Sequence, residues 1–164
     1  MYCKARIGGH PIHPALVALP MGLFVATFAS LIAYAVTSDP FYYRAALVGD
    51  GVAVVMALVS AIPGAIDLAT LPAGKVRATG VRHALLGGAT LVAFAACGAV
   101  LWREWDLGTL GVALPLALAS VGMAALLIAA AMGFALVQTH KIGVRPTHLR
   151  SVPAPRSSES IRTA

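Results

Sequence analysis

One long uncharged stretch near the N-terminus decides the fold of this chain. Residues 7–38 read IGGHPIHPALVALPMGLFVATFASLIAYAVTS and contain no Asp, Glu, Lys or Arg. A helix needs about 20 consecutive apolar residues to cross the hydrocarbon core of a bilayer. We therefore expect a membrane-spanning helix over residues 14–36. Pro14 suits its first turn, where a missing N–H has no helical partner to lose.

Three more apolar segments follow the first. They cover residues 44–71, residues 83–102 and a part of residues 107–140. Four spans joined by short connections predict an all-α, integral membrane four-helix up-down bundle. We expect one transmembrane domain over residues 1–145 and a disordered cytoplasmic tail over residues 146–164, which is rich in Ser, Pro and Arg from Ser151 onward.

The composition agrees with a membrane protein. Of the 164 residues, 59% are hydrophobic and only 11% are charged, where soluble domains carry about 25% charged residues. A soluble globule of this size could not bury so much apolar surface, so an ordinary soluble enzyme, a disordered chain and a disulfide scaffold are excluded. The net charge of +6 comes from dispersed residues without the basic-aromatic platform that binds nucleic acid.

The distribution of Lys and Arg predicts the orientation of the bundle. Ten of the 12 basic residues lie before the first span, between the second and third, or after the fourth; only Arg44 and Arg103 lie on the other side. The positive-inside rule then places both termini in the cytoplasm of a bacterial inner membrane. Aromatic residues at the opposite ends predict an outer interfacial belt: Phe41, Tyr42, Tyr43, Trp102 and Trp105.

Two local patterns concern helix packing. Pro20, Pro63 and Pro115 fall inside the expected helices and predict kinks. Small residues recur every fourth position, as Gly22, Ala26 and Ser30 and again as Ala125, Ala129 and Gly133. Such faces let helices approach closely in lipid. We interpret them as packing surfaces within the bundle, with homo-oligomerisation as the alternative.

Ionisable residues gather at the cytoplasmic end of all four spans. The set consists of His10, His13, Asp67, His83 and His140. Ionisable side chains within or beside a membrane span are costly and are functional candidates by default. Imidazole is the commonest metal ligand, and two imidazoles on different helices can hold a haem iron.

We expect His13 and His83 to be the first ligands of haem b, followed by His10 and His140. A transition metal ion bound by His10, His13, Asp67, His83 and His140 is the alternative cofactor, with Asp67 as a ligand or as an orienting group. The nearby Gly64, Gly87 and Gly133 either leave room for a flat macrocycle or allow tight helix packing.

The same residues can also be explained without a cofactor. A buried polar network, for example an Asp67–His83 pair, could hold the four helix ends together. Asp50 lies apart, towards the outer side, where we expect it to pair with Arg44 or to cap a kink.

Around the histidines and Asp67 the chain resembles a bacterial membrane family of unknown activity, domain of unknown function 2231. The matching segments are Gly9-His10-Pro11-Ile12-His13-Pro14, Pro63-Gly64-Ala65-Ile66-Asp67, Arg82-His83-Ala84 and His140-Lys141-Ile142-Gly143-Val144, with Lys141 in place of a glycine. The resemblance covers about residues 8–145. It implies a four-helix membrane domain, which in some members is joined to a Rieske iron–sulfur domain.

These observations leave two main functions open. The first is a small inner-membrane protein that binds haem or a transition metal and serves in electron transfer, or as a membrane subunit with a redox partner protein. The second is a non-catalytic membrane anchor or assembly protein with a structural His/Asp network. A transporter using Asp50 and Asp67 is a third interpretation, which the lack of an evident inverted repeat disfavours. No motif of a hydrolase is present, and the sequence does not decide whether the protein is an enzyme.

Overall fold

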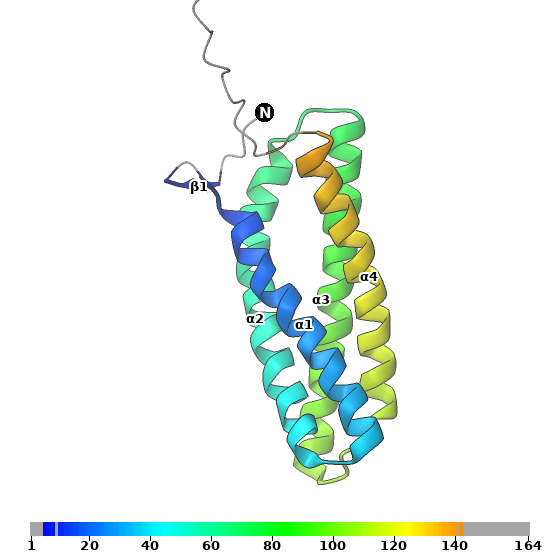
Figure 1. Ribbon diagram of the computed structural model, residues 1–164. Helices are drawn as coiled ribbons and strands as arrows, with labels where there is room; N and C mark the ends of the chain where they lie inside the picture. Colours follow the sequence, from blue (N-terminus) through cyan, green and yellow to red (C-terminus); the bar gives the residue numbers. More distant parts are fainter. Residues whose placement is uncertain (1–4, 9, 141, 143–164) are drawn as a thin grey trace, which may run out of the picture.

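The computed structural model describes residues 5–8, 10–140 and 142. It confirms an all-α, four-helix up-down bundle, preceded by a short antiparallel ribbon (Figure 1). The ribbon and helices are β1 (Arg6–Ile7), β2 (His10–Pro11), α1 (Ile12–Thr37), α2 (Pro40–Ala69), α3 (Lys75–Leu107) and α4 (Ala113–Gln138). All four helices are long and apolar enough to cross a membrane.

The connections are short because the residues at the helix ends stop each helix sharply. Ser38 adopts a left-handed conformation with φ 57°, which ends α1. Asp39 then caps α2 by accepting a hydrogen bond from the amide of Phe41 at 2.9 Å, with Pro40 at the first helical position. Gly108, with φ 70°, ends α3. The chain therefore turns back within a few residues at the end opposite to the ribbon.

One helix is longer than the sequence suggested. α3 begins at Lys75, eight residues before the start expected at His83, so Lys75, Arg77 and Arg82 belong to its first turns instead of a loop. Nothing in this polar segment breaks a helix, and Gly74, with φ 107°, provides the turn that precedes it. Apolar composition located the part of α3 inside the membrane but not its polar extension.

The outside of the bundle is apolar, as contact with lipid requires. Large hydrophobic side chains point away from the core on every helix, among them Val36, Val48, Leu85 and Phe134. In water, such continuous apolar surface would be a liability. The composition and the exposed surface together describe membrane-spanning helices in contact with a lipid bilayer.

Two of the local expectations were wrong. Pro115 lies in the first turn of α4 instead of its interior, where a missing N–H breaks no helical hydrogen bond, so it gives no reason for a kink. Tyr43 is fully buried and donates a hydrogen bond to the Leu101 carbonyl at 3.2 Å; it belongs to the core and not to an aromatic belt. Phe41 and Trp102 do face outward.

Many of the buried positions of one helical hairpin, α1–α2, recur at matching places in the other, α3–α4. In α1 they are Pro20, Phe24, Thr27 and Leu31, and 70 positions later in α3 they are Thr90, Phe94, Cys97 and Leu101. In α2 they are Ala46, Asp50, Ala53 and Ser60, and 69 positions later in α4 they are Pro115, Ala119, Gly122 and Ala129. The stacked rings of Phe24 and Phe94, with centroids 4.1 Å apart, join the hairpins. The bundle is therefore an approximate two-fold repeat of a single hairpin.

Candidate functional site: two imidazoles between the hairpins

The first histidine of the site is held by the neighbouring helix. His13 is the second residue of α1, and its Nδ1 lies 2.8 Å from the carbonyl oxygen of Ser60 on α2. In a helix, the side chain at position i+4 lies over the carbonyl of residue i. Position i+4 from Ser60 is Gly64, which has no side chain, so the imidazole can reach the carbonyl. A Cβ on Gly64 would come within 2.8 Å of the His13 ring.

The second histidine is held in the same way by the other hairpin. His83 lies on α3, and its Nδ1 is 2.8 Å from the carbonyl oxygen of Ala129 on α4. Four residues beyond Ala129 stands Gly133, where a Cβ would come within 3.1 Å of the His83 ring. Each hairpin of the repeat therefore supplies one histidine, one exposed carbonyl and one glycine.

The two rings meet inside the bundle. The ring centroids of His13 and His83 are 6.2 Å apart, and the ring planes make an angle of 78°. α1 packs mainly against α2, and α3 mainly against α4, so the contact joins residues of different hairpins. The structure thus brings together the two histidines that the sequence favoured as ligands.

Their hydrogen bonds fix the tautomer of both rings. A carbonyl oxygen can only accept, so Nδ1 carries the proton and donates it in both cases. In the neutral ring, the other nitrogen, Nε2, then has a free lone pair. A metal-binding imidazole usually donates its other ring N–H to a backbone carbonyl or a carboxylate. Both rings therefore have the hydrogen bond that favours binding of a metal through Nε2.

The remaining predicted ligands lie at the same end of the bundle but outside this pair. Asp67, near the end of α2, accepts a hydrogen bond from the Ala5 amide at 3.1 Å and so ties the N-terminal segment to the bundle. His140 lies just beyond the end of α4. For His10, the backbone belongs to β2, and the side chain lies outside the described part of the structure. Within the described residues, no group of three or more His, Cys, Asp or Glu side chains could hold a metal ion.

Two of the glycines near the site do not leave open space for a macrocycle. Gly64 and Gly133 give their space to the imidazoles themselves, which supports the packing interpretation at these two positions. Gly87 has no atom within 4 Å of the place of a Cβ, apart from its own helix. The sequence contains one signal for this arrangement: His13 recurs as His83 after 70 positions, and Gly64 recurs as Gly133 after 69 positions.

The surroundings of Asp50 differ from the pairing with Arg44 that the sequence suggested. The Arg44 guanidinium lies over the Trp105 ring, 4.9 Å from its centroid, instead of pairing with Asp50. Asp50 is fully buried, and neither carboxyl oxygen has a hydrogen-bond partner among the described residues; the same holds for the hydroxyl of buried Thr27. Thr27, in the middle of an apolar run, was not identified as a candidate.

Comparison with known proteins gives one match. A family model described as "Predicted membrane protein (DUF2231)" matches residues 9–146, which include every helix of the bundle. No curated protein and no solved structure matches the chain.

Proposed function

The chain belongs to the DUF2231 family of predicted membrane proteins, and within this four-helix bundle we propose that His13 and His83 would hold a haem through their imidazole nitrogens. The protein would act as a small electron-transfer subunit of a bacterial inner membrane, with a redox protein as its partner. The observation that carries the proposal is the pair of neighbouring imidazoles from different hairpins, each with Nδ1 bonded to a backbone carbonyl.

The distance between the rings suits two ligands of one iron atom. Two imidazoles that bind one ion with metal–nitrogen bonds of about 2.0–2.1 Å would have ring centroids at most about 6.4 Å apart. The observed separation is 6.2 Å. Haem iron needs only two protein ligands of this kind, whereas a bare transition metal ion usually takes three or four. Since the described residues offer no third ligand beside the pair, haem is favoured over a bare ion.

The residues around the pair would perform the supporting work. The Ser60 and Ala129 carbonyls orient the rings and, by accepting Nδ1–H, make Nε2 a stronger donor towards the iron. Lys75, Arg77 and Arg82 are exposed on the first turns of α3, at the end of the bundle that holds the pair, where they could bind the haem propionates. A bound haem supplies reversible uptake of one electron.

The test is the absorption spectrum of the protein purified from haem-replete cells. We expect a Soret band that shifts on reduction and about one haem per chain. His13→Ala and His83→Ala should each abolish the band. His140→Ala is the matched control, since His140 lies at the same end outside the pair, and this variant should keep it.

A second candidate function follows from the same contacts. Because His13 and His83 are already bonded and packed on glycines, they could serve only to join the two hairpins of a membrane anchor. In that case both alanine variants lose thermal stability while the wild-type protein carries neither haem nor a transition metal. Absence of both cofactors from replete preparations would therefore overturn the haem proposal and leave the structural one.

A further inference from the structure

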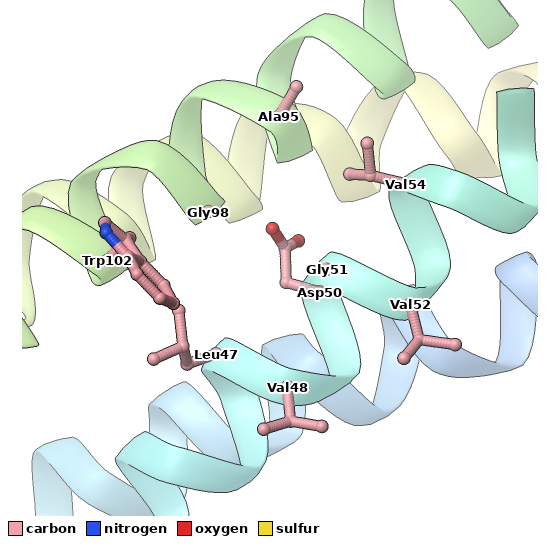
Figure 2. Close-up of a pocket in the computed structure, with 9 residues that line it drawn as sticks. All are labelled: Leu47, Val48, Asp50, Gly51, Val52, Val54, Ala95, Gly98 and Trp102. Carbon is pink, nitrogen blue, oxygen red and sulfur yellow. The ribbon is translucent and has the colours of Figure 1, made fainter.

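A second site lies on the opposite half of the bundle from the histidines, in the seam between α2 and α3. A pocket of about 460 Å³ opens there, lined almost entirely by apolar side chains. Figure 2 shows the Asp50 carboxyl group directed from α2 towards Gly98 on α3, with Trp102 along the same helix. Val48, Val52 and Trp102 on its rim are exposed to the surroundings of the bundle, so the pocket is open to lipid.

Asp50 is the ionisable group of this pocket. Its side chain is 0% exposed, and both carboxyl oxygens are without a partner in the described part of the chain. An isolated buried carboxylate costs far more free energy than the neutral acid. The neutral acid has an O–H donor and a carbonyl acceptor, and both need a partner. A buried polar group of this kind calls for a ligand or an ion that satisfies it.

The internal repeat shows that the key residues of this pocket occur in only one of the two matching seams. In the equivalent seam between α4 and α1, the counterpart of Asp50 is Ala119, and the counterpart of Gly98 is Phe28. Phe28 packs against the core, where Gly98 leaves space for the carboxyl group. The seam between α2 and α3 therefore differs from its copy at the two positions that create a polar cavity.

We propose that this pocket binds the carbonyl-bearing ring of a lipid-soluble molecule of the quinone class. The apolar walls and the opening towards lipid suit a hydrophobic ligand that arrives through the bilayer. The Asp50 carboxyl lies at the wall of the pocket and is covered in this structure; a ligand that separates α2 from α3 at Gly98 would accept a hydrogen bond from its O–H through a ring carbonyl. The Trp102 indole offers a flat face for the ring. The site is independent of the proposed haem, because its residues do not overlap with those around His13 and His83.

The test uses the two tryptophans of the chain and decylubiquinone as the probe. In a Trp105→Phe background, Trp102 is the remaining tryptophan, so quenching of tryptophan fluorescence under selective excitation reports on the pocket. We expect saturable quenching in detergent, with an affinity at least tenfold weaker after Asp50→Leu. Asp50→Asn, which keeps an N–H donor, should stay within a few-fold of the parent. Decanol, which has a similar tail but no carbonyl ring, should not saturate.

Two results would overturn this proposal. One is quenching that rises linearly with the probe, as simple partitioning into the detergent predicts. The other is equal affinity of the parent and a folded Asp50→Leu variant. This variant should fold, since it replaces a buried polar group without a partner by an apolar one of the same branched shape, and the adjoining pocket leaves room for its larger methyl groups.

Infrared spectroscopy tests the same proposal without a substitution at position 50. The C=O stretch of the protonated carboxyl should shift when decylubiquinone is added to the parent, and an unchanged band would also refute the proposal. His13→Ala should leave both signals intact even if it removes haem, so that failure of one proposed site can be distinguished from failure of the other.

Discussion

At the scale of single residues, the glycines of α2 and α4 matter for the carbonyls that they uncover. Gly64 and Gly133 each stand one helical turn after the carbonyl that a histidine reaches. A side chain there would cover the acceptor and collide with the ring. Other glycines, such as Gly87, face open space, so glycines of similar appearance in the sequence have unequal importance.

Substitution by alanine should distinguish the glycines that uncover a carbonyl from the glycines that face open space. Gly64→Ala places a Cβ within 2.9 Å of His13 Nδ1 and should break its hydrogen bond, which costs about 1–3 kcal/mol when a buried donor is left unsatisfied. Gly133→Ala, with a closest approach of 3.1 Å, should cost less. Thermal unfolding in detergent measures both effects.

Gly87→Ala is the control for this comparison. It meets no atom and should stabilise α3 by about 0.5–1 kcal/mol, the usual gain of alanine over glycine in a helix. Equal melting temperatures for Gly64→Ala and Gly87→Ala would contradict the role given to the uncovered carbonyl.

At the scale of the helices, the bundle consists of two close hairpins joined by fewer contacts between them. α1 packs on α2 and α3 on α4, while the seams between the hairpins are less extensive. Inside the bundle, the hairpins meet through the His13–His83 contact and the stacked Phe24 and Phe94 rings. These aromatic contacts between α1 and α3 should contribute strongly to the association of the hairpins.

A double-mutant cycle on Phe24 and Phe94 tests this view. The rings are stacked at 4.1 Å with an interplanar angle of 24°, and such pairs contribute about 0.5–1.5 kcal/mol beyond the area they bury. Phe24→Leu and Phe94→Leu should each destabilise the protein, and the double variant should lose less than the sum. Strictly additive losses in detergent unfolding would show that the rings do not act as a pair.

At the scale of the whole molecule, an even number of spans brings the ribbon, the α2–α3 connection and the end of α4 to the same side (Figure 1). That end holds the histidine pair and the basic residues that begin α3. The opposite end carries the tight turn at Ser38 and Asp39 and exposed Trp102 nearby. The two ends of the bundle therefore differ in their polar and charged residues.

Topology reporters should show which end of the bundle faces the cytoplasm. Ten of the 12 basic residues precede α1, lie in the first turns of α3 or follow α4 in the sequence, so the positive-inside rule predicts a cytoplasmic C-terminus. A reporter that is active only in the periplasm should be silent at the C-terminus and active when inserted after Gly108. The reverse pattern would invert the bundle and place the histidine pair on the outer side.

The sequence by itself determined the class and the layout of this protein. Four apolar segments of spanning length leave few alternatives to a helical membrane bundle, because a bilayer requires every backbone group to be satisfied within a helix or a closed barrel. Because consecutive spans run in opposite directions, one end of each helix lies on the same side of the membrane. For this reason His13 and His83 could be chosen as a pair, although they are far apart in the chain.

Only the tertiary structure decided what each polar group contacts. The partners of His13 and His83 are backbone carbonyls, and every residue has a carbonyl, so no residue type in the sequence announces them. Arg44 and Asp50 could have paired by charge, but the rotation of α2 turns Asp50 inward to Gly98 and leaves Arg44 over Trp105. The two-fold relation of the hairpins was not evident from the sequence, because only a few matching positions, such as Phe24 and Phe94, carry the same residue, while most of the matching buried positions differ in residue type. Hydrophobic patterning fixes which segments enter the membrane, whereas helix rotation and register, set by close packing, fix the sites.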